Sequence, residues 1–407
     1  MLNLAKMKSI YLDYAATTPT HELVVAEMQP YHACVFGNPS SLHHFGRDGK
    51  RALDLARDQL AALLNADPEE IVFTGSGTEA DNFALKGVAY AQAERGRHII
   101  TSKIEHHAIL ESAAFLESQG WRVTYLNVDT NGVVDLDELQ KALTPETVLV
   151  SIMHANNEIG TIQPVEKIAE IIRQFNLRQR SEKNSGVAAS PVYFHTDAVQ
   201  TAGILGVDVK KMRVDLLSVS AHKFYGPKGV GALYINKGTR ISSFMHGGGQ
   251  ERGRRASTEN VAGIAGFGKA AEIAQKERKG WAEHAAKLRD KLTEGILKTI
   301  PDSILNGHPT ERLPGNVNVS IKYVEGEAML LNLDMQGIAC STGSACSSGS
   351  LEPSHILLAI GRTHADAHSS LRFSLGRHTT EEDIDFVLEV LPKIVSRLRA
   401  MSPLYKK

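Results

Sequence analysis

The chain has 407 residues, of which 42% are apolar and 22% are charged, and its formal net charge is -1. This balance gives no general attraction to nucleic acid or to a membrane, so we expect neither as a direct partner. No apolar run approaches the length that spans a bilayer, and the first eight residues lack the apolar core of a signal peptide. We therefore expect a cytoplasmic protein of about two domains.

The three cysteines, Cys34, Cys340 and Cys346, form an odd and sparse set. Such a set argues against a disulfide framework and suits a reducing compartment. Cys340 and Cys346 also lack the two-residue spacing of zinc-binding or thioredoxin-like cysteines. We predict no metal site.

Short apolar strands alternate with amphipathic helices through the first half of the chain. Strands are predicted at residues 10–12, 71–73, 98–101, 122–126, 148–153, 192–194 and 214–219, and helices begin near residues 44, 77, 107, 136 and 165. Repeated strand–helix units with strands this apolar are typical of an α/β domain with a mainly parallel sheet. Ligands of such sheets bind beyond the carboxyl ends of the strands.

A glycine-containing turn, Gly75-Ser76-Gly77-Thr78, joins the strand at 71–73 to the next helix. Free backbone N–H groups and the helix dipole make such a helix start an anion site, although glycines there can also serve only the turn. The turn lacks the Gly-Lys-Ser/Thr of a Walker A loop and the spacing of a dinucleotide-binding loop. A single phosphate group therefore fits it better than a di- or triphosphate.

Polar residues follow three of the later strands. Singly, each group has an ordinary structural explanation as a helix cap or a turn. The groups are Glu105-His106-His107, the stretch from His154 to Gly160, and the stretch from His195 to Gln200. Together they place polar side chains on the same sheet edge as the glycine turn.

Lys223 stands directly after the apolar run at 214–219, in Ser220-Ala221-His222-Lys223. A strand that delivers a lysine to a loop at the ligand edge favours a nucleophilic amine that forms a Schiff base, because partial burial lowers the pKa of a lysine. A solvent-exposed lysine at a strand end is the alternative. The neighbouring polar groups favour the nucleophile.

Two further segments precede the last third of the chain. Residues 175–190 end in small and polar side chains, and we expect a solvated, mobile insertion there. The glycine-rich loop at 246–258 contains three arginines but no interleaved aromatic residues. It therefore favours contact with an anionic ligand or a second subunit over contact with nucleic acid.

The remaining residues predict a smaller α+β domain after helices at 261–299. It contains strands at 316–321, 337–340 and 370–374 and helices at 327–333 and 381–399. Residues 341–350 are almost all small, so they cannot bury apolar area and we expect a mobile loop. A cysteine on such a loop favours a nucleophile, which is our interpretation of Cys346. Cys34 and Cys340 are interpreted as core residues.

Three motifs together resemble one family. They are Ser220-Ala221-His222-Lys223, the stretch from His246 to Gly253, and the stretch from Gly343 to Ser350. From Tyr11 to about Leu404 the chain resembles the pyridoxal-phosphate-dependent cysteine desulfurases of the NifS/IscS type. The resemblance implies a fold type I, aminotransferase-like large domain at 16–260 and a smaller C-terminal domain at 261–407, with an N-terminal arm at 1–15 packing on the latter. It also implies a homodimer with sites at the subunit interface.

The resemblance implies roles for individual residues. Lys223 would form the Schiff base with pyridoxal 5'-phosphate, and Cys346 would be the sulfur-accepting nucleophile. The cofactor contacts implied are Asp197 with the ring nitrogen, Gln200 with the ring hydroxyl, His106 stacked on the ring with Asn157 beside it, and Gly77, Thr78, Ser220 and His222 with the phosphate. Thr258 would reach the phosphate in the neighbouring subunit. Arg372 would bind the substrate carboxylate, assisted by Asn38 and Asn157.

The implied reaction converts L-cysteine to L-alanine and leaves the sulfur on Cys346 as a persulfide. His106 would carry the proton. A sulfur-acceptor protein, such as an iron–sulfur scaffold, would receive the sulfur for iron–sulfur cluster assembly or tRNA thiolation. The alternatives are a selenocysteine lyase, another class V aminotransferase-like enzyme, or a non-catalytic sulfur-transfer scaffold.

Overall fold

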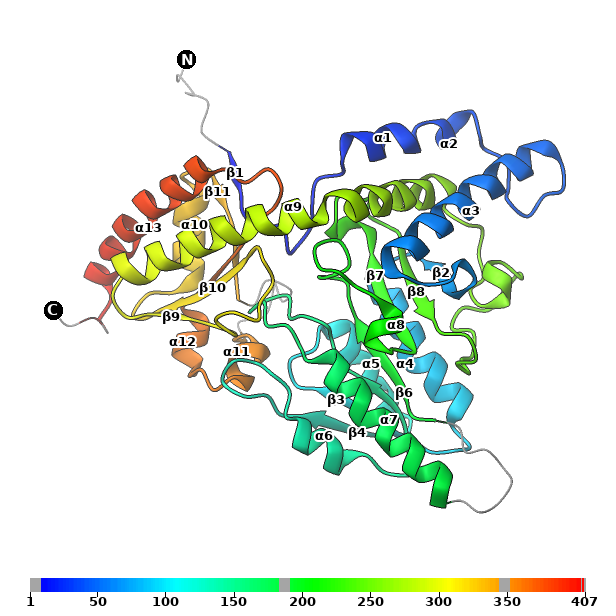
Figure 1. Ribbon diagram of the computed structural model, residues 1–407. Coiled ribbons are helices and arrows are strands. Elements are labelled where there is room, and N and C mark those ends of the chain that lie inside the picture. Colours follow the sequence, from blue (N-terminus) through cyan, green and yellow to red (C-terminus); the bar gives the residue numbers. More distant parts are fainter. Residues whose placement is uncertain (1–8, 183–190, 344–351, 404, 406–407) are drawn as a thin grey trace.

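The computed structural model describes residues 9–182, 191–343, 352–403 and 405. A seven-stranded sheet in the order β2-β8-β7-β6-β5-β3-β4 forms the larger part of the molecule (Figure 1). Its strands are β2 (Ile71–Thr74), β3 (His98–Ser102), β4 (Arg122–Leu126), β5 (Thr147–Ser151), β6 (Tyr193–Asp197), β7 (Leu216–Ser220) and β8 (Gly231–Ile235). Neighbouring strands are parallel except where β8 pairs with β7 and β2. The predicted mainly parallel sheet is confirmed.

Alternate residues of each strand point to opposite faces of this sheet. Helices cover both faces, so the residues on both are buried. Ile99 packs on one face with α4 (Gly77–Gln92) and α5 (His107–Ser118). Its neighbour Ile100 packs on the other face. That second face is covered by α3 (His44–Leu64), α7 (Val165–Glu182) and the first half of α9 (Val261–Thr299). The residues that directly follow the carboxyl end of each strand lie beyond these two packed faces, at the edge of the sheet.

A second, antiparallel sheet has the order β12-β13-β10-β9. Its strands are β9 (Ser303–Leu305), β10 (Asn316–Ile321), β12 (Ser341–Thr342) and β13 (Ser370–Ser374). They share a separate core with α10 (Gly326–Asp334), α13 (Glu381–Met401) and the second half of α9. The 39-residue helix α9 therefore contributes to both cores, and Figure 1 shows it running along both parts of the molecule. The predicted domain boundaries at residues 15 and 260 stay predictions.

The start of the chain lies against the second core. Strand β1 (Ile10–Tyr11) pairs in parallel with β11 (Ile338–Ala339), and Leu12 is fully buried beside them. The following residues turn toward the large sheet, where Thr18 N–H donates to the carbonyl of His222 at 2.9 Å. This arm therefore contacts both parts of the molecule.

The remaining elements connect these layers. They are α1 (Glu22–Met28), α2 (Pro30–Ala33), η1 (Pro68–Glu70), α6 (Leu136–Ala142), α8 (Val209–Met212), η2 (Ala221–Lys223), η3 (Glu251–Gly253), α11 (His355–Ala359) and α12 (His364–His368). No helix in the described part of the chain is long and apolar enough to cross a membrane.

Two expectations from the sequence are wrong. Residues 175–182 are not a solvated insertion, because α7 continues through them with Phe175 in the core and Asn176 bonded to both backbone groups of Val192. The rest of that predicted insertion, 183–190, lies outside the described residues. Cys34 is not a core residue: it caps the single turn of α2 and is exposed. Cys340 is buried, as predicted.

Candidate active site

A cavity of about 290 Å³ lies at the carboxyl-end edge of the large sheet. Every predicted cofactor-binding and substrate-binding residue lines it, except Asn38 and Thr258. Those two side chains are exposed elsewhere on the chain. Cys346 lies outside the described residues. The polar groups that follow separate strands in the sequence therefore meet at one site.

Lys223 ends the short turn η2 directly after β7. Its Nζ donates hydrogen bonds to the backbone carbonyls of Ala15 and Ala16, at 2.6 and 2.9 Å. The N-terminal arm therefore holds the lysine amine at the wall of the cavity.

Asp197 ends β6 and is buried. Its Oδ1 accepts a hydrogen bond of 2.8 Å from the N–H of Val199. Burial raises the pKa of Asp197 to about 6, and the nearby charge of Lys223 acts in the opposite direction. A partly desolvated carboxylate in this position gains from pairing with a cation inside the cavity.

The glycine turn forms a second wall. Ser76 caps α4, whose first residue is Gly77, so the positive end of the helix dipole points to this wall. A Cβ added to Gly77 would lie 2.8 Å from Val199 Cγ2 and 3.3 Å from Ser220 Cβ. Glycine is therefore required for the backbone to approach this corner closely, and the corner suits a phosphate group.

Two neutral imidazoles flank the cavity. His106 is the N-cap residue of α5, and its pKa is lowered to about 4 chiefly by burial and then by Lys223. His222 accompanies Ser220 beside the glycine turn, and burial lowers its pKa to about 4 as well. Its Nδ1 lies 3.1 Å from Thr17 Oγ1. Both rings are therefore uncharged near pH 7.

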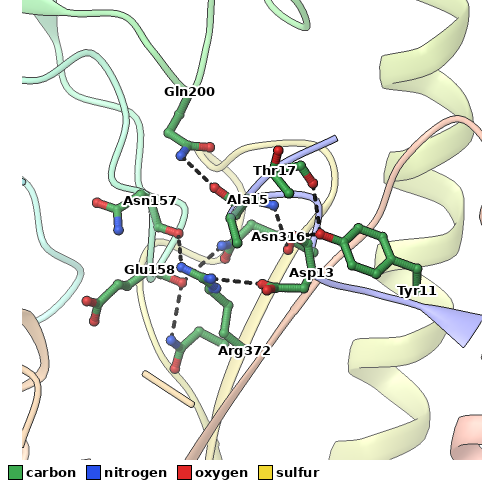
Figure 2. A network of polar contacts seen from close by, with 12 residues as sticks. Tyr11, Asp13, Ala15, Thr17, Asn157, Glu158, Gln200, Asn316 and Arg372 are labelled. Carbon is green, nitrogen blue, oxygen red and sulfur yellow. Dashed lines mark hydrogen bonds and ion pairs between the residues drawn. The ribbon is translucent and has the colours of Figure 1, made fainter. Parts of the chain in front are cut away.

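Arg372, on β13, brings the smaller part of the molecule to the cavity (Figure 2). Its side chain is only 2% exposed and forms an ion pair of 2.9 Å with Asp13 through Nη2. Its Nη1 donates to the backbone carbonyl of Asn157 at 3.1 Å. Its Nε–H is buried and has no partner within the described part of the chain, so the guanidinium retains an unused donor there.

The sequence reasoning assigned no site role to Asp13, Ala15, Ala16 or Asp81. Asp81 is 1% exposed and lines the cavity, and burial together with the charge of Asp197 raises its pKa well above the ordinary range. The sequence places Asp81 inside a predicted helix, and that position does not indicate that its side chain is buried. Asp13 follows the first predicted strand, and only that position at a strand end could have indicated a role.

No metal-binding group of three His, Cys, Asp or Glu side chains occurs within the described ranges. The site instead combines an amine, a carboxylate, a helix start and a guanidinium. These are the groups that hold a phosphorylated, positively charged ring beside an amino acid.

Comparison with known proteins bears on this combination. The family model for class-V aminotransferases matches residues 10–387. The chain belongs to the class-V aminotransferase family. It is 55% identical over 401 residues to a protein named cysteine desulfurase IscS from Clostridium botulinum, covering 98% of this chain and 97% of that protein. It is 54% identical over 400 residues to a protein of the same name from Methanosarcina thermophila, covering 98% and 95%.

Solved structures agree with the family assignment. A structure titled NifS-like protein matches with a TM-score of 0.87 at 39% identity, covering 96% of this chain and all of that one. A structure titled SspA in complex with cysteine matches with a TM-score of 0.77 at 34% identity, covering 91% and 100%. The predicted aminotransferase-like fold is confirmed.

Enzymes of this family depend on pyridoxal phosphate, so the cofactor prediction is confirmed. The residues present fit that group. Asn157 Oδ1 and Arg372 Nε are buried and find no hydrogen-bond partner in residues 9–182, 191–343 and 352–403, and the close approach at Gly77 leaves a corner for phosphate.

Proposed function

We propose that this protein is a cysteine desulfurase, which converts L-cysteine to L-alanine and transfers the sulfur to Cys346. The convergence of Lys223, Asp197 and Arg372 on one cavity carries the proposal, because it joins an amine, a partner for a ring nitrogen and a carboxylate-binding group. The high identity to proteins named cysteine desulfurase supports the choice of reaction within the family.

Different residues around the cavity would bind different parts of the cofactor. Lys223 would bind its aldehyde carbon covalently, and Asp197 would pair with the ring nitrogen. Gln200 would bond the ring hydroxyl, and His106 would stack on the ring beside Asn157. The phosphate would lie against Gly77, Thr78, Ser220 and His222. Pyridoxal phosphate, when bound, supplies a ring that accepts electrons from the α-carbon of an amino acid.

The substrate carboxylate would bind Arg372, because a planar guanidinium forms two parallel hydrogen bonds with a carboxylate. Asn157 lies on the same wall and would assist. We assign Asn38 a supporting role from its motif, although its side chain lies away from the cavity and its Oδ1 accepts from the N–H of Ser40.

Cys346 would attack the sulfur of the substrate as a thiolate. A sulfur–sulfur bond forms and the carbon–sulfur bond of cysteine breaks, so the electron pair stays with the substrate carbon, which takes up a proton to give alanine. His106 would move this proton. The reaction therefore needs no external oxidant.

The chain on both sides of the segment that holds Cys346 is anchored beside the cavity. Ser341, before it, pairs with Arg372 in the antiparallel register of β12 and β13. Ser354, after it, donates to Glu158 Oε2 at 2.5 Å, and His355 Nε2 lies 3.1 Å from the carbonyl of Glu105. These anchors support a role for Cys346 at this site.

We further propose a cytoplasmic homodimer in which Thr258 contacts the cofactor phosphate of the partner subunit. Thr258 is exposed on its own chain and therefore accessible to another subunit. The persulfide sulfur would pass to an acceptor protein for iron–sulfur assembly or tRNA thiolation. The small number of cysteines supports the cytoplasmic part of this proposal, because such a composition suits a reducing compartment.

Incubation of the pure holoprotein with L-cysteine tests the function. We expect alanine as product and a persulfide on Cys346 when its peptides are mapped by mass spectrometry. No alanine from cysteine, with rapid alanine formation from selenocysteine, would favour a selenocysteine lyase. A colourless protein that borohydride does not modify would favour a non-catalytic scaffold.

A further inference from the structure

Arg372 is one of the largest fully buried side chains of the protein, and its charge needs compensation. Within the part of the chain that the structure describes, Asp13 supplies the one carboxylate at ion-pair distance, 2.9 Å from Nη2. Glu158 is drawn near Arg372 in Figure 2, but burial raises its pKa to about 7, and its carboxyl accepts a hydrogen bond from Ser354. Asp13 is therefore the main counter-charge of Arg372.

The backbone around Asp13 is fixed against the strand that carries Arg372. Asp13 forms a parallel bridge with Ser374, and the hydroxyl of Ser374 accepts from the N–H of Ala15 at 2.9 Å. Ser374 and Arg372 stand two residues apart on β13, so their side chains share one face of the strand. The hydroxyl of Tyr11 donates to the carbonyl of Asp13 at 3.0 Å, as Figure 2 shows.

The orientation of the guanidinium follows from these contacts. Asp13 binds Nη2 and the carbonyl of Asn157 binds Nη1, whereas Nε–H is buried and has no hydrogen-bond partner among the residues that the structure describes. Two fixed acceptors determine the plane of a guanidinium, and its three remaining N–H donors then have defined directions.

We propose that Asp13 is a positioning residue for the substrate: it holds Arg372 in the orientation that binds the carboxylate of the amino acid. The inference rests on the proposed function and assigns the N-terminal arm a part in substrate binding. Asp13 need not touch the substrate, because it acts through Arg372. Substitution of Asp13 therefore weakens the binding of ligands that carry a carboxylate and does not change the affinity for ligands that lack one.

Steady-state kinetics of Asp13→Ala with L-cysteine test the proposal. We expect KM to rise at least about tenfold while kcat changes less than about threefold, because a fixed binding group is lost and the reacting groups remain. Asp13→Asn keeps an acceptor oxygen for Nη2, so its KM should rise less than that of Asp13→Ala. An unchanged or lowered KM in Asp13→Ala would overturn the proposal.

The double variant Asp13→Ala/Arg372→Ala separates positioning from an independent effect. If Asp13 acts through Arg372, the double variant binds cysteine no more weakly than Arg372→Ala alone. Additive losses would overturn the proposal. Glu22→Ala is the matched control, because Glu22 also joins the N-terminal chain to the last third through a 2.9 Å ion pair, with Arg377, but is 74% exposed. Its KM should equal that of the unaltered protein.

Binding without turnover provides a second readout. Titration of the holoprotein with L-alanine and with ethylamine, followed by visible absorption, should show weaker binding in Asp13→Ala for L-alanine alone. Thermal unfolding checks that each variant is folded, and Asp13→Asn serves if Asp13→Ala is not. Failure to form alanine from cysteine in the unaltered protein would count against the proposed function, whereas equal L-alanine affinities would count against the role of Asp13.

Discussion

The Nδ1 atom of His106 accepts a hydrogen bond from the backbone N–H of Ala108, at 3.1 Å. This bond caps α5 and fixes the tautomer of the ring. Because burial keeps the imidazole uncharged, its one hydrogen is carried by Nε2. In this state the ring donates a hydrogen bond through Nε2, and it can carry a proton only if the cap breaks and Nδ1 accepts one.

Substitution of His106 separates these two roles. Asparagine is a good N-cap residue, so His106→Asn should retain the free energy of unfolding, whereas His106→Ala should lose about 1 kcal/mol. Both variants lose the proton carrier, and we expect kcat to fall by roughly 10²-fold or more. Denaturant unfolding and steady-state kinetics measure the two effects. Full activity in His106→Asn would show that the ring moves no proton.

The amine of Lys223 is predicted to hold the cofactor covalently. Lys223→Ala should therefore abolish turnover and the visible absorption band of the bound cofactor, and borohydride should no longer fix the cofactor to the chain. Lys228→Ala is the control, since Lys228 follows on the same loop but is exposed. Retained colour and activity in Lys223→Ala would contradict the assignment.

The sequence predicted the strands well because burial on both faces leaves a clear apolar signal. The fully buried strands Asn316–Ile321 and Ser370–Ser374 are confirmed to the residue, and so is the less buried edge strand Arg122–Leu126. The prediction from the sequence failed where an element contacts residues that are distant in the sequence. The helix continues through Phe175, and Asn176 on it bonds to Val192, a contact that a run of polar residues does not reveal.

The site shows the same division. Residues that follow strands, such as Asp197 and Lys223, could be brought together from the order of the strands alone. Asp13 could not be placed beside Arg372, because 359 positions separate them and only the pairing of the N-terminal arm with the second sheet brings them together. The burial of Asp81 likewise depends on the packing of α4 over the sheet.

The glycine corner predicts a defect in cofactor affinity. In Gly77→Ala the new methyl group would lie 2.8 Å from Val199 Cγ2, so the side chain of Val199 or the backbone must shift, at a cost of roughly 1–3 kcal/mol. We expect the apoprotein to bind pyridoxal phosphate about tenfold more weakly or worse. Equilibrium titration measures this. Gly206→Ala is the control, because nothing lies within 4 Å of its added Cβ. Equal dissociation constants would contradict a close phosphate at Gly77.

The exposed Cys34 provides a control for the predicted nucleophile. Cys346→Ser should keep the cofactor spectrum but form no persulfide and release no sulfide from cysteine, because a hydroxyl cannot accept the sulfur. Cys34→Ser should behave like the unaltered protein, since its thiol lies apart from the cavity. Mass spectrometry of the cysteine-treated proteins locates the persulfide. A persulfide on Cys34 in both the unaltered protein and Cys346→Ser would contradict the assignment of Cys346.

A buried carboxyl next to His106 predicts a pH-dependent stability. Glu105 is fully buried, and its carboxyl accepts hydrogen bonds from the hydroxyl of Ser102 and the N–H of Met153. Burial raises its pKa from 4.5 to about 8, although these hydrogen bonds act against the rise. The folded protein therefore retains a proton that the unfolded chain has released.

The sign of the effect follows from this proton. The stability that neutral Glu105 contributes is fully present below pH 4.5 and is lost as the pH rises through about 8, with a slope of up to about 1.4 kcal/mol per pH unit. Glu105→Gln mimics the neutral acid and should not show this loss. Denaturant unfolding at several pH values between about 5 and 9 measures the difference between the two proteins. The exposed Glu69→Gln should follow the unaltered protein throughout. If Glu105→Gln does so too, Glu105 titrates alike in the folded and unfolded chain, and its buried carboxyl holds no extra proton.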